Sequence, residues 1–202
     1  MKKNQRNIQA ILELASSSEI IEGKLWYPTA NQIATHLAET YGVAFYEAVG
    51  VLSALSPRNK WSRNKIDAER TINAYVSGGA PAAFENKVCT FTSNKKKAIM
   101  ILEANEGKES VDWQDILDIL SGAKLCEFAN CIKGNPDITI DGHAWCIWEG
   151  CRSSLKDVPR ITKKSREQIK EDYRQVALAN GMEGFELRAI TWVTYRRIHG
   201  LK

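Results

Sequence analysis

The segment from Phe45 to Leu55, FYEAVGVLSAL, is apolar on nearly every side of the helix that its spacing predicts. Such a helix belongs at the centre of a bundle, where other elements cover it all round. Apolar residues recur at helical spacing along most of the chain, and strands and helices do not alternate in it. The sequence therefore predicts an all-α protein.

The remaining helices are expected wherever apolar residues recur three and four positions apart. Pro57 ends the central helix, Gly78 and Gly79 end the next one, and Thr29 is the expected N-cap of the helix that follows Tyr27-Pro28. The expected helices cover about residues 8–15, 29–38, 45–55, 63–76, 94–103, 112–120, 125–132, 164–179 and 185–198, and one more begins at Asp141.

Composition narrows the class of protein. A chain of 202 residues fits one domain, or one compact fold in two lobes, and its net charge of +4 is compatible with a polyanionic partner. Five cysteines without a CxxC pair indicate reduced thiols and a cytoplasmic protein. No segment approaches the roughly 20 apolar residues that cross a membrane, so no membrane partner is expected.

A short glycine-containing turn, SGAK, separates two of the expected helices. Such a turn exposes backbone N–H groups at the start of the second helix, where the helix dipole also favours a phosphate. Lys124 adds a positive charge there, although glycine turns between helices are also common plain connectors. The candidate phosphate contacts are Ser121, Gly122, Ala123 and Lys124.

A lone carboxylate, Asp141, stands between the apolar run ITI and the helix that follows. An aspartate before a helix is a favoured N-cap, worth about 1 kcal/mol. Apolar neighbours also desolvate such a carboxylate in part, and it can then stabilise a developing cation or take a proton from water. His143 could bind a phosphate or a carboxylate, but a structural histidine is the more frequent outcome. Both interpretations stay open.

The polar loop PRNKWSRN follows the central helix and combines cations, amides and one aromatic residue. That mixture suits phosphate contacts with Trp61 near a base, although Trp61 packed into the core is an equally open alternative. Runs of cations are also common on a solvated surface. The candidate DNA contacts are Ser56, Arg58, Asn59, Lys60, Trp61, Arg63 and Asn64.

Taken in order, the segments GVLSALSP, NKKKAIMIL, ILSGAKLCEFANCI and ITIDGHAWCI resemble the helix-hairpin-helix (HhH-GPD) superfamily of DNA glycosylases. In that superfamily a helix reading VLSAQ leads into a DNA-probing loop, the hairpin reads LPGVG, and VDTH or LDGN carries the catalytic aspartate. Gly122 matches the first hairpin glycine, and Asp141 follows it 19 residues later. Asp141 and His143 match the acid and the histidine of VDTH.

The resemblance covers about residues 44–200 and is strongest to small members from bacteriophages and their hosts. It implies a two-lobed helical fold within a single domain. One lobe would combine both ends of the chain, about residues 1–45 and 150–202, and about residues 46–149 would form the lobe with the hairpin.

The chain departs from the superfamily pattern at several positions. Ser121 replaces the hairpin proline, Lys124 replaces the second hairpin glycine, and Leu55 replaces a polar residue that probes the duplex. Leu125 or Cys126 stands where bifunctional members carry a Schiff-base lysine, so lyase activity is not expected. The C-terminal four-cysteine motif is missing, so no iron–sulfur cluster and no other cofactor is expected, apart from a monovalent cation that the hairpin could hold.

The resemblance implies a monofunctional DNA glycosylase that flips a damaged or modified base out of double-stranded DNA. Asp141 would stabilise the oxocarbenium-like sugar or orient water, Lys124 would hold a phosphate, and His143 would support the acid or contact a phosphate. We expect the protein to act as a monomer. Two alternatives stay open: a phage-type transferase that modifies a base in DNA, and a DNA-binding protein without catalysis.

Overall fold

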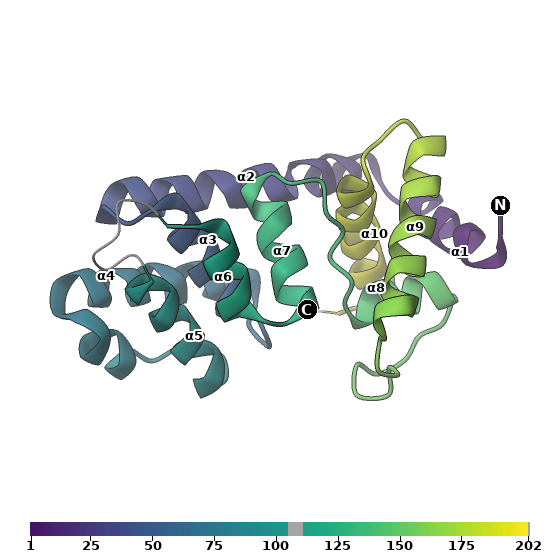
Figure 1. Cartoon of the computed structure of the whole chain (residues 1–202). Coiled ribbons are helices and arrows are strands. Elements are labelled where there is room, and N and C mark those ends of the chain that lie inside the picture. Colours follow the sequence, from purple (N-terminus) through teal and green to yellow (C-terminus); the bar gives the residue numbers. More distant parts are fainter. Residues whose placement is uncertain (105–110, 202) are drawn as a thin grey trace. The chain divides into compact units, whose positions relative to one another are not determined.

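The computed structural model of the chain describes residues 1–104 and 111–201 (Figure 1). All regular structure in these ranges is α-helical, which confirms the all-α prediction. The chain divides into two compact units: unit 1 is Met1–Pro28 with Gly134–Lys202, and unit 2 is Thr29–Lys133. The resemblance places this division near residues 45 and 150, whereas here Asp141 falls in the unit that contains both ends of the chain.

Unit 1 consists of helices from both ends of the sequence. They are α1 (Lys3–Glu13), the first part of α2 (Ser17–Tyr41), α8 (Gly142–Glu149), α9 (Lys163–Ala179) and α10 (Gly184–Ile198). Helix α1 packs against α8, α9 and α10. At Gly23 in α2, a Cβ atom would lie 2.5 Å from the Cα of Ile190 in α10, so only glycine allows these two helices to come this close.

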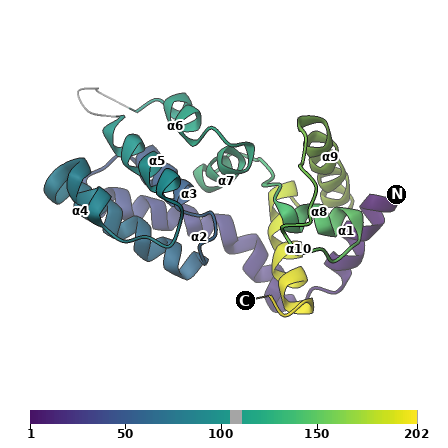
Figure 2. The same cartoon turned by 90° about the horizontal axis from the view of Figure 1, so that it is seen from below.

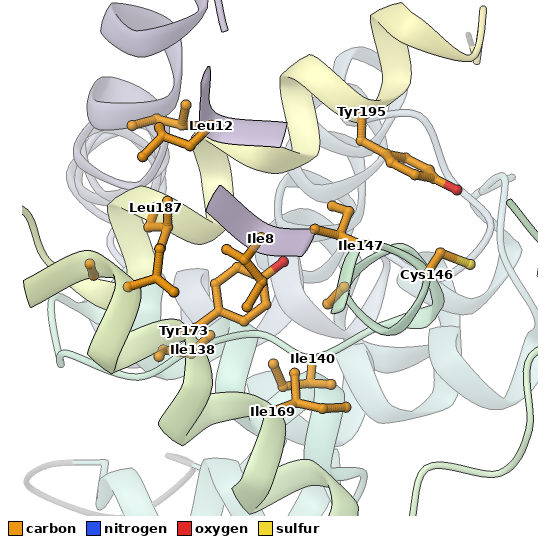
Figure 3. Packing of buried hydrophobic residues seen from close by; sticks show 14 residues of the cluster. Ile8, Leu12, Ile138, Ile140, Cys146, Ile147, Ile169, Tyr173, Leu187 and Tyr195 are labelled. Carbon is orange, nitrogen blue, oxygen red and sulfur yellow. The ribbon is translucent and has the colours of Figure 1, made fainter. Parts of the chain in front are cut away.

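The core of unit 1 is built from the apolar faces of these helices and from the segment that leads into α8 (Figure 3). Ile8 from α1 and Tyr173 from α9 are completely buried in it. Beside this core, the carboxylate of Asp172 accepts hydrogen bonds from Gln5 and from the indole of Trp148, both at 2.9 Å. This buried carboxylate therefore joins α9 to α1 and α8.

Unit 2 is arranged around α3. Its helices are the rest of α2, α3 (Phe45–Ala54), α4 (Trp61–Glu85), α5 (Thr92–Glu103), α6 (Trp113–Leu120) and α7 (Ala123–Lys133). Helix α3 packs against α4, α5, α6 and α7, and eight of its ten residues are buried (Figure 2). The apolar segment Phe45–Leu55 is therefore the central helix of its unit, as its composition predicts.

Most predicted helix ends are confirmed, and one is wrong. Asp112 caps α6 by accepting a hydrogen bond from the N–H of Gln114, and Gly78 and Gly79 interrupt α4 with non-helical backbone. Thr29, however, does not begin a helix, because α2 continues through Pro28. Proline removes the hydrogen bond to the carbonyl of Lys24, and both Pro28 and Lys24 are exposed residues of α2.

Candidate functional site

Asp141 is the N-cap residue of α8 and directly follows the buried residues Ile138 and Ile140. Its Oδ1 atom accepts a hydrogen bond from the backbone N–H of Ala144 at 2.9 Å, which confirms the predicted cap. Burial of the two isoleucines anchors the chain that enters the helix. The carboxylate is therefore held in a defined position, and 17% of the Asp141 side chain remains exposed.

Arg188 in α10 forms an ion pair with Asp141. The Nη2 atom of Arg188 donates to Oδ1 of Asp141 at 2.6 Å, and its Nε atom donates to the carbonyl of Thr139 at 2.9 Å. Only 4% of Arg188 is exposed, so its charge depends on the carboxylate for compensation. The guanidinium in turn stabilises the ionised form of Asp141.

The electrostatics of Arg188 follow from this arrangement. Burial is the largest single effect and acts to lower the pKa of the guanidinium, but the charge and hydrogen bond of Asp141, together with Tyr173 and Tyr27, outweigh it, so the pKa is raised overall. Sequence reasoning missed this residue. The available signal was an arginine within ELRAITW, where its neighbours Leu187, Ile190 and Thr191 take the inward positions of a helix.

His143 lies in the first turn of α8, close to Asp141. Its Nδ1 atom is 3.9 Å from Oδ2 of Asp141, which is longer than a hydrogen bond but close enough for attraction when the imidazole is protonated. The imidazole also lies beside the ring of Tyr195, with the ring centroids 5.9 Å apart. The structure therefore brings His143 and Asp141 together at the start of α8.

The loop between α8 and α9 covers the start of α8. A Cβ atom on Gly142 would lie 2.6 Å from Cδ2 of Leu155, so a larger residue there would have to displace that side chain. The loop also carries exposed cations on either side of Leu155, at Arg152, Lys156 and Arg160. The loop beside the start of α8 therefore carries three exposed cations and one exposed acid, Asp157.

The predicted hairpin is present in unit 2. Helix α6 ends at Leu120, Ser121 adopts the left-handed conformation with φ of 53°, and α7 begins at Ala123. Ser121 and Lys124 are exposed. The first N–H groups of any helix lack acceptors within that helix, so the start of α7 has donors to offer beside the Lys124 ammonium.

A second cation, Lys97 from α5, reaches the same hairpin. Its Nζ atom donates to the carbonyl of Leu120 at 2.5 Å and to Oγ of Ser121 at 2.7 Å. A positive charge at the C-terminus of α6 is favourable, because the last carbonyls of a helix carry partial negative charge. The Lys97 ammonium therefore contacts the turn between α6 and α7 directly. The sequence showed Lys97 only as part of a lysine run.

The loop after α3 separates into exposed cations and inward-facing amides. Arg58 and Lys60 are exposed, and Lys60 precedes the first residue of α4. Ser56 donates to the carbonyl of Ser53 at 2.9 Å. The ring of Trp61 meets the ring of Phe128 in α7 edge-on, at 6.3 Å between centroids, and Trp61 is half-buried.

The other three predicted contacts of this loop support it from inside. Asn64 is completely buried and donates to the carbonyl of Leu52 at 2.9 Å. Asn59 donates to Oδ2 of the buried Asp67 at 3.0 Å, and Arg63 donates to Oδ1 of the same carboxylate at 2.7 Å. Asn64 is therefore placed to hold the loop and not to meet a ligand from solvent.

The predicted site residues thus form two groups. Asp141 and His143 belong to unit 1, together with Arg188, while the hairpin and the loop after α3 belong to unit 2. In the part of the chain that the structure describes, no three His, Cys, Asp or Glu side chains come close enough to hold a metal ion. None of the described helices combines the length and hydrophobicity that crossing a membrane requires.

A family of unknown function (DUF7178) matches residues 1–199, which is nearly the whole chain. No curated protein and no solved structure matches the chain.

Proposed function

We propose that this chain, which belongs to the family of unknown function DUF7178, binds DNA and hydrolyses the N-glycosidic bond of a damaged or modified base. The observation that carries the proposal is how Asp141 is held. Its carboxylate is fixed by the start of α8 and by the buried Arg188, and 17% of the Asp141 side chain is exposed. A fixed, ionised and accessible acid is what cleavage of a glycosidic bond requires.

The chemistry assigned to Asp141 is electrostatic. As the bond between C1′ and the base nitrogen breaks, the sugar becomes an oxocarbenium-like cation, and a nearby carboxylate stabilises it. Water then adds to C1′, its proton leaves to solvent or to the departing base, and free base and an abasic site result. A carboxylate held in advance by Ala144 and Arg188 needs no reorganisation during this step, which makes its charge more effective.

Arg188 limits the kinds of role that Asp141 can fill. A carboxylate that shares Oδ1 with a guanidinium at 2.6 Å is a weak proton acceptor, because protonation would leave the buried Arg188 without its counter-charge. We therefore assign Asp141 to stabilising the sugar cation and orienting water, and we do not assign it to general base catalysis. The position of His143 near Oδ2 suits a supporting role for the imidazole.

Unit 2 supplies the proposed contacts with the DNA backbone. The Ser121–Gly122 turn presents the start of α7 and the exposed ammonium of Lys124, a combination that suits a phosphate. Arg58 and Lys60 add two exposed cations at the loop after α3. Flipping the target base out of the duplex costs a few kcal/mol, which such backbone contacts help to offset.

A second candidate is a DNA-binding protein without catalysis. It is favoured by the two hydrogen bonds that Oδ1 of Asp141 accepts, because a carboxylate with a purely structural role would make these same contacts. In that case Asp141 would close the N-terminus of α8 and neutralise Arg188, and it would act on no substrate.

Mass spectrometry of the products separates these functions. The protein is incubated with DNA duplexes that carry a range of damaged and modified bases, and both free bases and nucleosides are measured. Hydrolysis predicts release of a free base and an equal amount of abasic sites. An intact nucleoside with added mass would replace the proposal with group transfer, and unchanged DNA bound by the protein would leave the non-catalytic candidate.

A further inference from the structure

Two phenylalanine rings in unit 2 remain largely exposed although the unit has a well-packed core. Phe84 near the end of α4 is 46% exposed, and Phe91 immediately before α5 is 47% exposed. Phe91 occupies the N-cap position of α5, and its side chain makes no capping hydrogen bond there. Isolated exposed apolar side chains are ordinary on a protein surface, but each of these two rings has a cation beside it.

A cation lies over each ring. The guanidinium carbon of Arg58 is 4.9 Å from the centroid of Phe91, and the Nζ atom of Lys95 is 4.9 Å from the centroid of Phe84. Lys95 also donates to the carbonyl of Phe84. Because Lys95 follows Phe91 by one helical turn in α5, the two cation–ring pairs adjoin each other. We call these four residues the Phe84–Phe91 surface.

The backbone beneath this surface is held rigidly by Asp67, a completely buried residue. Its Oδ2 atom accepts hydrogen bonds from Nδ2 of Asn59 at 3.0 Å and from the backbone N–H of Cys89 at 2.8 Å. Thr90 Oγ1 donates to the carbonyl of Pro57 at 2.8 Å. The loop that carries Arg58 and the segment that leads to Phe91 are therefore tied together from inside.

The backbone of Arg58 is itself unusual. Its φ of 54° lies in the left-handed region, which costs an ordinary residue energy. The hydrogen bonds made by Asn59 and Thr90 hold the residues on both sides of Arg58. With the backbone held in this way, the guanidinium lies over the ring of Phe91. A residue with a strained backbone thus holds a cation against an exposed ring at this surface.

The charge around the rings is positive. Three further exposed lysines lie near the two rings in the sequence: Lys60, Lys87 and Lys96. One exposed acid, Glu85, lies in the same stretch. Exposed aromatic rings among cations are how proteins bind single-stranded nucleic acid, since the bases stack on the rings and the phosphates meet the cations.

We infer that the Phe84–Phe91 surface binds unpaired nucleotides of single-stranded DNA. The inference deepens the proposed function, on whose DNA binding it rests, by naming a contact for unpaired bases next to the backbone contacts of unit 2. One base stacks on Phe91 and another on Phe84, while Arg58 and Lys95 contact the adjoining phosphates. Base stacking tolerates any sequence, so binding is predicted to show little sequence preference.

The test is binding of a fluorescent oligothymidine of about 15 nucleotides, measured by anisotropy, with a duplex of the same length as comparison. Phe91→Leu and Phe84→Leu keep an apolar side chain but remove the ring, and each should weaken single-strand binding about tenfold. Val76→Ala changes another exposed apolar residue of α4 and should bind like the wild type. Thermal unfolding of each variant confirms that it is folded.

The inference is overturned if the wild type does not bind the single strand, or if both leucine variants bind it as the wild type does. Its failure is distinguishable from failure of the proposed function. Loss of single-strand binding in the leucine variants, with no base released by the wild type, supports the surface and removes the glycosylase. Base release by the wild type, with unchanged single-strand binding in both variants, supports the glycosylase and removes the Phe84–Phe91 surface as a binding site.

Discussion

The Nη2 atom of Arg188 lies 2.6 Å from Oδ1 of Asp141, and this contact joins α10 to the N-terminus of α8 across 47 positions of sequence. The same oxygen also accepts the hydrogen bond that caps α8. One carboxylate therefore closes a helix, neutralises a buried cation and remains partly exposed. Its structural and proposed catalytic roles meet at one residue, so they have to be separated by experiment.

Replacing Arg188 with Met should destabilise unit 1. The substitution keeps most of the apolar stem but leaves Asp141 without its counter-charge, and breaking a buried ion pair from one side costs roughly 3 kcal/mol. Urea unfolding measures the loss. Asp141→Asn leaves the cap in place, because asparagine is a good N-cap, but it removes the charge that Arg188 needs.

The double variant Asp141→Asn with Arg188→Met completes a thermodynamic cycle. Because both charges are then gone, its loss of stability should be smaller than the sum of the two single losses. Strict additivity of the two losses would mean that the pair seen in the structure has no energetic coupling.

The hairpin makes a prediction through Ser121. A residue with a φ of 53° is strained unless it is glycine, and a β-branched side chain is strained most. Ser121→Val should therefore lower the free energy of unfolding by about 1–2 kcal/mol, and Ser121→Gly should leave it unchanged or raise it slightly. Urea unfolding of both variants checks this order, and equal stability of the two would refute the left-handed turn.

The buried carboxyl group of Glu47 should make the stability of the wild type depend on pH. Burial raises the pKa of this carboxyl group, despite the hydrogen bond that it accepts from the N–H of Ala44 at 2.7 Å. The folded state thus holds the proton more tightly than the unfolded state, so wild-type stability falls as pH rises above the ordinary pKa of 4.5.

Glu47→Gln keeps an oxygen for the Ala44 N–H and removes the charge. The variant should melt at a higher temperature than the wild type at neutral pH, and the difference should shrink as the pH falls toward 4.5. Glu39→Gln, at an exposed position of α2, is the matched control. A lower melting temperature for Glu47→Gln at neutral pH would contradict the account.

Glu19 predicts the opposite pH dependence. A hydrogen bond from Arg197 is the main cause that lowers the pKa of Glu19 from 4.5 to about 2, against the effect of burial. The resulting stability is complete above the ordinary pKa and is lost as the pH falls toward about 2. Arg197→Met should therefore lower the melting temperature near neutral pH, and the difference should shrink as the pH falls toward about 2, where only the lost hydrogen bond to the Leu14 carbonyl remains.

The control for Arg197→Met is Lys24→Met, which removes an exposed cation from the same unit. It should leave the pH profile of the wild type unchanged. An Arg197→Met deficit that stayed constant from neutral pH down to about pH 2 would assign its cause to packing and not to the ionised Glu19.

The sequence predicts the helices and the caps well because these depend on local chemistry. Asp112 and Asp141 both cap the helices they precede, and the SGAK turn forms a hairpin. Pro28 misled the prediction, because α2 continues through this exposed proline. The rule that proline separates two helices therefore does not hold at this position.

The candidate site was only partly predictable because some of its contacts are not local. Arg188 reaches Asp141 from another helix, and Lys97 reaches Ser121 across 24 positions. Nothing in the spacing of the sequence reveals such partners. Asn64 shows the converse, because an amide in a polar loop was expected to face DNA and instead holds the carbonyl of Leu52 inside the unit.

The central claim, that the charge of Asp141 serves catalysis, is tested most directly by single-turnover base release from the duplex that yields product. The comparison is between the wild type, Asp141→Asn, and Asp157→Asn as an exposed control in unit 1. We predict that Asp141→Asn binds the duplex as the wild type does but releases base at least about a hundredfold more slowly. A folded Asp141→Asn variant that releases base at the wild-type rate would contradict the account.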